Sequence, residues 1–518
     1  MKLSKYIILA AVVVFLGACD NGFEEMNKNP YGLTTIDPAL LFANAVRTTH
    51  PGQWEGEQTI VQQFLNAYDL GATSGFNFNL DNNNFNNPKW NTNYETPVKL
   101  LVQAIALAEE NGANVNLMSM MRIWKAYVFM TLVDTYGDVP YSQSGKAYLE
   151  VNYFPVYDDD QAIYEDLYNE LRAAAAALDP AASYVPEDIL YGNSSATPSA
   201  TAAVQTAKWR KLANSLLLRL GMRYSKVNQG KAAEIVSEAV DAGVMESNAD
   251  DAYLRFSTVY TNQLNQGPRT INPRYYYMAE PFVNFLKETE DPRAKYIVGK
   301  YVEPNNAPNE TPDITLTNQF GFPVGYNQNT ITSHPDYRGT AGQGFNYSQL
   351  NFRVVGSAVA PILFVTHSQT KLLMAEAAQR GWIGGSAQQY YEEGIRASME
   401  EWSLYPNTPD VAITEEETAA YLSQPEVVFD ASNALEQINT QYWVSNVANG
   451  AESFANFRRS GYPVLTPNPA NGGLAGGGFV RRMAYPDDES SENESSYQAA
   501  VAAIGGDNLT TRVFWDIP

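Results

Sequence analysis

The sequence is poor in the side chains on which metal, redox and nucleophilic sites depend. In 518 residues it has one cysteine, Cys19, and three histidines, His50, His334 and His367, which stand far apart. One cysteine excludes a disulfide within the chain, and no histidine lies in a metal-ligand or nucleophile motif such as H-E-x-x-H. A G-x-S-x-G motif and a phosphate-binding glycine loop are also missing. We therefore predict no catalytic residue, no metal ligand and no cofactor.

Basic side chains are also scarce. The 34 Lys and Arg stand against 57 Asp and Glu, which gives a formal net charge of -23. An acidic surface repels phosphate backbones and anionic headgroups, whereas neutral sugars are indifferent to it, so we expect no nucleic-acid partner. The many acids keep one enzymatic alternative open, a glycoside hydrolase, because the separation between two carboxyl groups is not visible in a sequence.

The sequence has no apolar run long enough for a transmembrane helix. The run from Tyr6 to Leu16 is shorter than the ~20 residues that span a bilayer. It follows two lysines and precedes Gly17-Ala18-Cys19, which is the order of an export signal. The end of this segment looks like a lipobox. We therefore expect residues 1–18 to be a lipoprotein signal peptide and Cys19 to be the lipid anchor.

Helical periodicity, by contrast, is abundant. Between Trp209 and Ser225, apolar residues recur at Trp209, Leu212, Leu216 and Leu220, the spacing of one helix face. Similar spacing occurs in Val98–Glu110, Leu117–Tyr136, Gln161–Leu178, Ala232–Ala242, Glu280–Glu288, Thr366–Gly381, Ala387–Trp402 and Leu435–Ser460. Several of these segments pair as helix, short turn, helix. The sequence predicts a mainly α fold, a scaffold of helical hairpins of the tetratricopeptide kind.

Three long segments, residues 66–97, 258–277 and 303–360, lack this periodicity. Loops of that length are usually functional or disordered, and the aromatic content of these segments argues against disorder. Short strands are expected at 352–355 and 362–365. Because no Pro/Ser-rich linker divides the chain, we predict a single body at 19–518, in which the helical scaffold is interleaved with a large, irregular, loop-rich ligand-binding lobe that has few short strands.

Several motifs recur in a recognisable order along this body. They are Asn27–Pro30, Asp37–Leu41, Asp134–Tyr141, Lys208–Leu216, Ala375–Ala378, Tyr391–Arg396, Phe457–Pro463 and Gly505–Asp516. Together with the lipobox, they resemble the SusD/RagB family of nutrient-binding outer-membrane lipoproteins. The resemblance runs from Cys19 almost to the end of the sequence.

This resemblance implies a protein anchored to the cell outer membrane through lipidated Cys19 and facing outward. Such a protein captures a nutrient, here a glycan or oligosaccharide, and delivers it to a SusC-like TonB-dependent transporter, over which it opens and closes as a lid. Three alternatives stay open: peptide uptake by a protein of the same type, a surface adhesin that needs no transporter, and the glycoside hydrolase.

Sugar-binding surfaces combine aromatic rings, which stack on the apolar faces of pyranoses, with groups that bond sugar hydroxyls. Candidates in the loop-rich segments are Tyr68, Asp69, Trp90, Asn91, Tyr94, Tyr275, Tyr276, Phe320 and Tyr326. Trp90 is the leading stacking residue, with Asn91 and Asp69 as hydroxyl partners, because family members tend to draw binding residues from this early loop. The alternative is that Trp90 and Tyr94 pack one turn apart at the start of a helix. Three adjacent tyrosines, 275–277, cannot all face one core if extended, so at least one should be exposed.

Overall fold

The computed structural model describes residues 36–518 except 53, 69–80, 113, 193–199, 408–411, 470–473 and 475–476. Its longer helices are α3 (Pro38–Thr48), α6 (Asn83–Asn93), α7 (Lys99–Asn111), α8 (Val115–Tyr136), α10 (Asp160–Ala177), α11 (Ala202–Arg223), α12 (Gln229–Asp241), α14 (Glu280–Glu288), α16 (His367–Gln379), α17 (Ala387–Glu400), α18 (Glu415–Leu422), α19 (Ala434–Ser445), α20 (Gly450–Ser460) and α22 (Glu494–Ile504). Short helices are α4 (Glu57–Ile60), α9 (Ala147–Glu150), α13 (Gln266–Thr270), α15 (Ala294–Ile297) and α21 (Glu489–Glu492). The predicted mainly α fold is confirmed.

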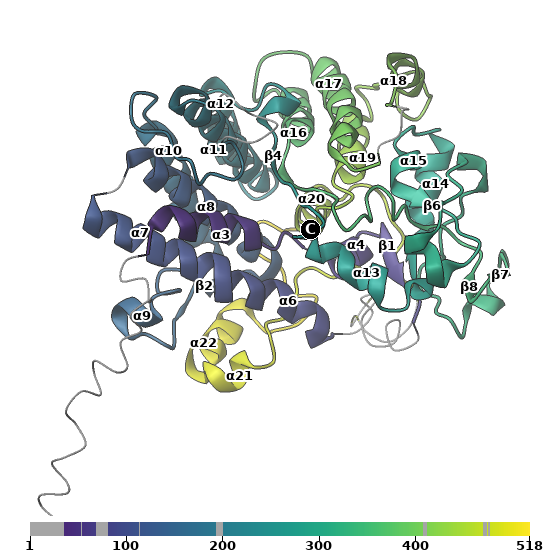
Figure 1. Cartoon of the computed structure of the whole chain (residues 1–518), viewed down its shortest axis with the longest axis horizontal. Helices are drawn as coiled ribbons and strands as arrows, with labels where there is room; N and C mark the ends of the chain where they lie inside the picture. Colours follow the sequence, from purple (N-terminus) through teal and green to yellow (C-terminus); the bar gives the residue numbers. More distant parts are fainter. Residues whose placement is uncertain are drawn as a thin grey trace, which may run out of the picture.

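Helices that are close in sequence pack against one another. The most extensive contacts join α16 to α17, α11 to α12, and α10 to both α8 and α11, and Figure 1 shows these helices at the left and top of the molecule. The amphipathic pattern around Trp209 explains α11, because Trp209 is fully buried on its inner face. Of the helices that the structure describes, none is both long and apolar enough to cross a membrane.

Local signals end and begin these helices as expected. Gly137 follows α8 with φ 79°, and Gly461 follows α20 with φ 85°, conformations that glycine adopts without strain. Thr366 caps α16 by accepting from the Gln369 N–H, while the Gln369 side chain accepts from the Thr366 N–H, a reciprocal capping box.

Three expectations about local structure were wrong. Residues 435–460 form two helices rather than one, because Asn449 leaves the helical path to cap α20 and donates to the Leu363 and Phe364 carbonyls. Residues 66–97 contain α6, which Asn82 caps by accepting from the Asn84 N–H. Residues 352–355 form turns, because Asn351 O accepts the N–H groups of residues 354 and 356.

The strands are short and form five two-stranded antiparallel pairs in the described part of the chain. They are β1 (Phe64–Asn66) with β5 (Tyr276–Met278), β2 (Val139–Pro140) with β3 (Tyr157–Asp158), β4 (Ala252–Leu254) with β10 (Ile362–Val365), β6 (Val298–Gly299) with β9 (Gln349–Leu350), and β7 (Thr340–Ala341) with β8 (Gly344–Phe345). The strand expected at 362–365 is therefore confirmed. The β1–β5, β4–β10 and β6–β9 pairs join segments that are distant in sequence.

Two apolar clusters hold the molecule together. The larger one runs through the helical scaffold and takes in Trp515, near the end of the sequence, whose side chain is fully buried and donates to Asp134 Oδ1 at 3.1 Å. The Arg223 and Arg458 guanidinium groups lie 5.6 and 4.8 Å from the Trp515 ring centroid. The smaller cluster comprises Leu65, Ala67, Tyr277, Ala279, Phe322, Ile331 and Tyr347. It is the core of a loop-rich lobe, residues 258–360 with β1, at the right of Figure 1.

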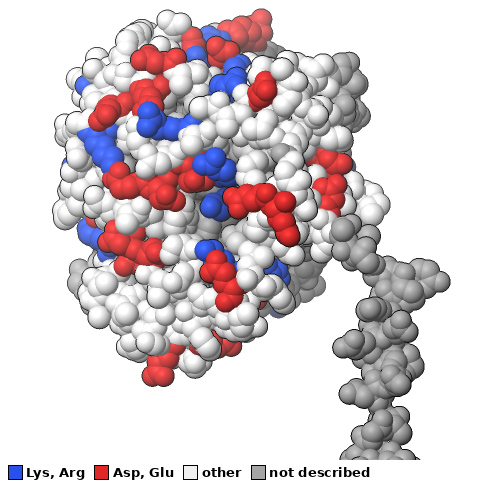
Figure 2. Space-filling model, turned by 90° about the vertical axis from the view of Figure 1, so that its left-hand side faces the viewer, with Lys and Arg blue, Asp and Glu red and all other residues white. Residues whose placement is uncertain are grey.

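One exposed apolar patch lies in α9 and the segment after it. Its residues are Tyr148, Leu149, Val151, Tyr153, Phe154 and Val156, of which Tyr148 is 84% and Phe154 66% exposed. Figure 1 shows α9 at the lower left of the molecule, the side that faces the viewer in Figure 2.

Candidate ligand-binding site

The pairing of β1 with β5 sorts the three adjacent tyrosines onto different surfaces. Tyr277 lies opposite Leu65 and is fully buried in the core of the lobe. Tyr276 points to the other side of the strand, where its ring stacks on Phe64 with centroids 6.0 Å apart. Tyr275 precedes the strand and stays partly exposed. Of the three, Tyr275 is therefore the ring that a ligand can reach.

Tyr275 meets Tyr68, the residue that follows β1 by two positions. Their ring centroids lie 5.0 Å apart at 50°, and Tyr68 is also partly exposed. The Arg274 guanidinium lies 4.9 Å from the Tyr275 centroid, and its Nη2 donates to Tyr275 Oη at 3.0 Å. We name Tyr68 and Tyr275 the tyrosine pair.

A partly buried acid, Glu55, fixes the backbone beneath this pair. Asn66 Oδ1 accepts the Tyr68 N–H at 2.8 Å, and Asn66 Nδ2 donates to Glu55 Oε1 at 2.9 Å. Burial raises the pKa of Glu55, while hydrogen bonds from Asn66 and Tyr276 pull that pKa back down. Glu55 thus ties β1 to β5 and orients the tyrosine pair. Asp69, the expected hydroxyl partner next to Tyr68, lies outside the described residues.

Trp90 is not exposed as a stacking platform. It lies on α6 with 4% of its surface exposed, and its ring centroid is 4.8 Å from that of Tyr94, 5.1 Å from Tyr136, 5.9 Å from Tyr157 and 5.6 Å from Tyr485. Other rings surround the indole. The structure therefore shows Trp90 packed against Tyr94 and its neighbours, not exposed to stack on a sugar. The indole is buried because the face of α6 that carries Trp90 is turned toward the scaffold.

The remaining candidates in this region are Asn91 on α6 and Tyr94 directly after it, and neither contacts the tyrosine pair. The Tyr94 hydroxyl donates to the Pro140 carbonyl at 2.7 Å, which ties its side chain to the scaffold. Asn91 is partly exposed. The main contacts of α6 are with α8 and the helical turn at 94–98, so Asn91 is not brought to β1 and β5.

Phe320 and Tyr326 lie in the lobe, packed against its small core. Both are partly exposed. Tyr326 makes an edge contact with His334, with centroids 4.9 Å apart. Phe320 is approached by three cationic side chains, Lys287, Lys300 and Arg338. These two rings form a second group within the lobe.

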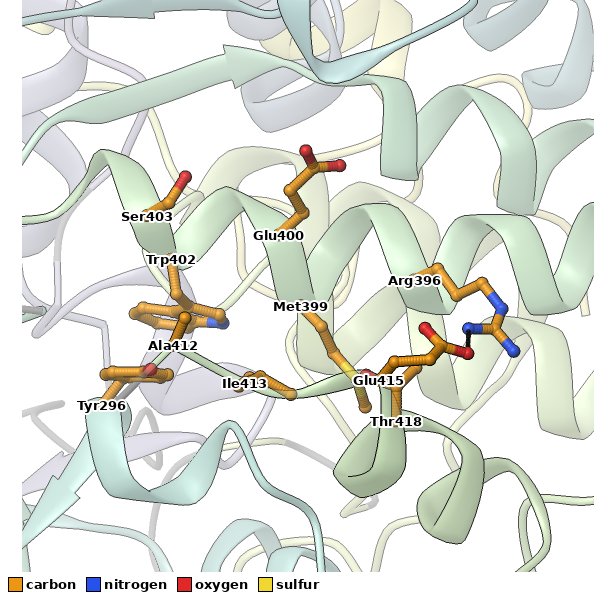
Figure 3. Close-up of a pocket in the computed structure, with 10 residues that line it drawn as sticks. All are labelled: Tyr296, Arg396, Met399, Glu400, Trp402, Ser403, Ala412, Ile413, Glu415 and Thr418. Carbon is orange, nitrogen blue, oxygen red and sulfur yellow. Dashed lines mark hydrogen bonds and ion pairs between the residues drawn. The ribbon is translucent and has the colours of Figure 1, made fainter. Parts of the chain in front are cut away.

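One cavity was not foreseen from the sequence. It has a volume of about 350 Å³ and lies between α17, α18 and the chain near α15 (Figure 3). Tyr296 and Trp402 stack in parallel at one end, with centroids 5.6 Å apart, and the Arg396–Glu415 ion pair stands at the other. Residues 296 and 402 are far apart in sequence, so no local pattern could have joined them. Both rings are buried, so they offer edges rather than faces to the cavity.

Three acids are placed as metal ligands can be. Carboxylate oxygens of Asp138, Asp159 and Asp160 lie within 4.8 Å of one another. Burial raises the pKa of Asp160 to about 7. Each carboxylate also accepts a backbone N–H, from residues 160, 162 and 514 respectively, at 2.8 to 2.9 Å. Capping of the start of α10 and binding of the C-terminal segment explain this cluster without an ion.

Comparisons with known proteins match most of the chain to a single protein family and to solved structures of similar length. A family model described as starch-binding and associating with the outer membrane matches residues 30–486. A chitin-binding protein of known structure is 26% identical, with a TM-score of 0.77 over 93% of this chain and 100% of that one. A SusD-like protein from Bacteroidetes is 24% identical, with a TM-score of 0.75 over 93% and 100% of the two chains. A chitin-binding SusD homologue from Flavobacterium johnsoniae is 22% identical, with a TM-score of 0.68 over 92% and 98%. No curated protein matches the chain significantly.

Proposed function

The chain belongs to the SusD-like family, described as starch-binding and associating with the outer membrane, and from this membership we propose that it captures a glycan at the cell surface and delivers it to a SusC-like TonB-dependent transporter. The observation that carries the proposal is the extent of the match, which covers residues 30–486 and so includes both the scaffold and the lobe. The 26% identity to a chitin-binding protein over nearly the full length of both chains supports a carbohydrate ligand.

The protein would reach its place at the membrane through its lipid. Residues 1–18 would be removed as a signal peptide, leaving diacylglycerol-modified Cys19 as the first residue of a single body. A lipoprotein with two or three acyl chains is stably anchored, whereas one chain binds only marginally. The acidic segment that follows, residues 20–25, supports display on the outer face.

The tyrosine pair is the proposed contact for the sugar. A partly exposed aromatic ring offers a face for the apolar C–H side of a pyranose, and Arg274 beside it offers N–H donors for hydroxyls. Glu55, through its hydrogen bonds with Asn66 and Tyr276, would hold the pair in place. Trp90, Asn91 and Tyr94 would support the scaffold instead of contacting the sugar.

Binding without chemical change is part of the proposal. A bound oligosaccharide would be recovered intact, whereas a glycoside hydrolase would release new reducing ends. A peptide carrier would bind peptides alone, and an adhesin would bind neither class of ligand.

Isothermal titration of residues 20–518 tests these readings, since removing the anchor deletes none of the described residues. The ligands are chito-oligosaccharides, malto-oligosaccharides, acidic oligosaccharides and peptides. Tyr275→Ala should weaken binding of the preferred glycan by roughly 2- to 10-fold, the value of one aromatic contact. Tyr148→Ala, which removes an exposed tyrosine on α9, is the matched control and should leave the affinity unchanged.

The outcomes separate the alternatives. Binding of an intact glycan that Tyr275→Ala weakens supports capture at the tyrosine pair. Equal binding by Tyr275→Ala moves the site elsewhere, and peptide binding alone replaces the glycan assignment. No binding by any ligand contradicts the proposed capture.

A further inference from the structure

Three cationic side chains converge on one ring of the lobe. Lys287 comes from α14, Lys300 directly follows β6, and Arg338 lies in the segment before β7. The Lys287 and Lys300 ammonium groups lie 4.0 and 5.7 Å from the centroid of Phe320, and the Arg338 guanidinium carbon lies 4.3 Å from it. Cation–π attraction to Phe320 holds the three positive groups around a common centre.

No acid neutralises this group within ion-pair distance. Among the described residues, neither lysine nor Arg338 forms an ion pair; Lys287 instead donates to the Gln319 carbonyl at 2.7 Å. The contrast with the rest of the surface is clear, because acids outnumber bases by 57 to 34. On the face shown in Figure 2, basic groups lie beside acidic ones. Elsewhere in the described chain, basic side chains such as Arg122 and Arg172 form ion pairs with Glu170 and Glu238.

The acids nearby have other partners or lie farther away. Asp313, whose backbone pairs with that of Lys300, accepts the Thr315 N–H at 2.8 Å and an Asn318 amide N–H at 2.7 Å. Glu280 interacts electrostatically with Arg338 but lies beyond ion-pair distance from it. The centre of the cluster, at Lys287, is therefore the most positive part.

The pKa of Lys287 reflects the same excess of positive charge. Burial lowers its pKa, and the positive charges of Arg338 and Lys300 lower it further, with no acid among the causes. Asp313 and Glu280 interact with Lys300 and Arg338 only from beyond ion-pair distance. Like charges with no counter-charge within ion-pair distance repel one another, and an anion placed among them would offset that repulsion.

We propose that Lys287, Lys300 and Arg338 bind an anionic group of the captured glycan, the carboxylate of a uronic acid or the sulfate of a sulfated sugar. The inference rests on the proposed function and names its ligand class. Arg338 is exposed and supplies the planar fork that matches either anion in bidentate fashion, while the two ammonium groups supply point charges. The acidic body excludes polyanions in general, and this cluster admits one charged group at a defined place.

Titration of residues 20–518 with three oligosaccharides of equal length tests the proposal. They are a neutral galactose oligomer, the same oligomer carrying one galacturonic acid, and the same oligomer carrying one sulfate. An acidic oligomer should bind about 10-fold more tightly than the neutral one, and the advantage should shrink between roughly 20 mM and roughly 200 mM salt. Whichever acidic oligomer binds more tightly identifies the anion.

Two variants locate the effect. Lys287→Gln and Arg338→Gln should each reduce affinity for the acidic oligomer by about 10-fold and leave affinity for the neutral one unchanged. Arg338→Lys, which keeps the charge, should retain part of the preference. Lys371→Gln is the matched control, because Lys371 also lies over a ring, that of Tyr390, but pairs with Glu393 at 2.8 Å.

Equal affinity for neutral and acidic oligomers would overturn this inference and leave glycan capture standing. A preference that survives both Lys287→Gln and Arg338→Gln would overturn the assignment to this cluster. Absence of binding by all three oligomers and by every other glycan would remove the proposed function as well as the inference.

Discussion

Replacing Glu376 with glutamine should destabilise the fold by about 3 kcal/mol at pH 7, because it breaks a buried ion pair at the centre of the scaffold. Glu376 lies on α16 and is fully buried. Its carboxylate accepts from Arg459 Nη1 and Nη2 at 2.8 and 2.6 Å, pairs with Arg380 Nη2 at 2.8 Å, and accepts from Asn439 Nδ2 at 3.0 Å. The substitution leaves Arg459 buried without its counter-charge.

The magnitude follows from the pKa of Glu376. Burial acts to raise this pKa, but Arg459 and Arg380 outweigh burial and hold it at about 2, against an ordinary value of 4.5. A difference of ~2.5 pKa units corresponds to about 3 kcal/mol. Because the folded-state pKa is the lower one, this stabilisation is present above pH 4.5 and is lost as the pH falls toward 2. The variant and the natural protein should therefore converge in stability as the solution is acidified.

Urea unfolding at pH 7 and at several lower pH values measures this difference. Glu393→Gln is the control, since Glu393 on α17 pairs with Lys371 near the surface and should contribute less than about 1 kcal/mol. The reasoning is refuted if Glu376→Gln costs no more than Glu393→Gln, or if its effect does not diminish at low pH.

Three further outcomes are expected. Trp90→Ala should lower stability by about 3 to 5 kcal/mol in urea unfolding, because it empties the space among four rings; a small change would contradict the packed role of Trp90. Tyr148→Ser combined with Phe154→Ser should shift the melting temperature by no more than about 2 °C, since both rings are mostly exposed; a large drop in thermal denaturation would mean that they pack. Burial lowers the pKa of His50 to about 4, so unfolding is favoured as the pH falls from 6.5 toward 4. Between pH 7 and pH 5 the natural protein should lose about 2 kcal/mol more stability than the His50→Gln variant. An unchanged pH dependence in the variant would show that His50 does not titrate in this way.

The helical scaffold could be predicted because its signals are local. Apolar spacing at Trp209, Leu212 and Leu216 indicates one buried face, and the structure buries all three. Glycines such as Gly137 mark the ends of helices by the conformation they adopt. Two of the misjudged segments have a common cause: asparagine both breaks and caps helices, so polar, asparagine-rich stretches hide α6 and the gap between α19 and α20.

The candidate site was less predictable, because exposure is decided by packing between distant segments. The sequence shows Tyr68, Trp90 and Tyr275 alike as aromatic residues among polar ones, and we expected Trp90 to lead. Only the pairing of residues 64–66 with 276–278 brings Tyr68 and Tyr275 together, and only the packing of α6 covers Trp90. The cations around Phe320 come from three segments, and no local pattern announces such a cluster.

The burial of Trp515 has a consequence for when the protein can fold. Its indole lies beside Asp134 of α8, Arg223 of α11 and Arg458 of α20, and Figure 1 shows the end of the chain at the centre of the molecule. Residue 515 lies outside these three helices, so each helix can form by local contacts before the space between them is filled. The scaffold therefore packs completely only when the segment that carries Trp515 joins it, which couples the final packing of three helices to the docking of one segment.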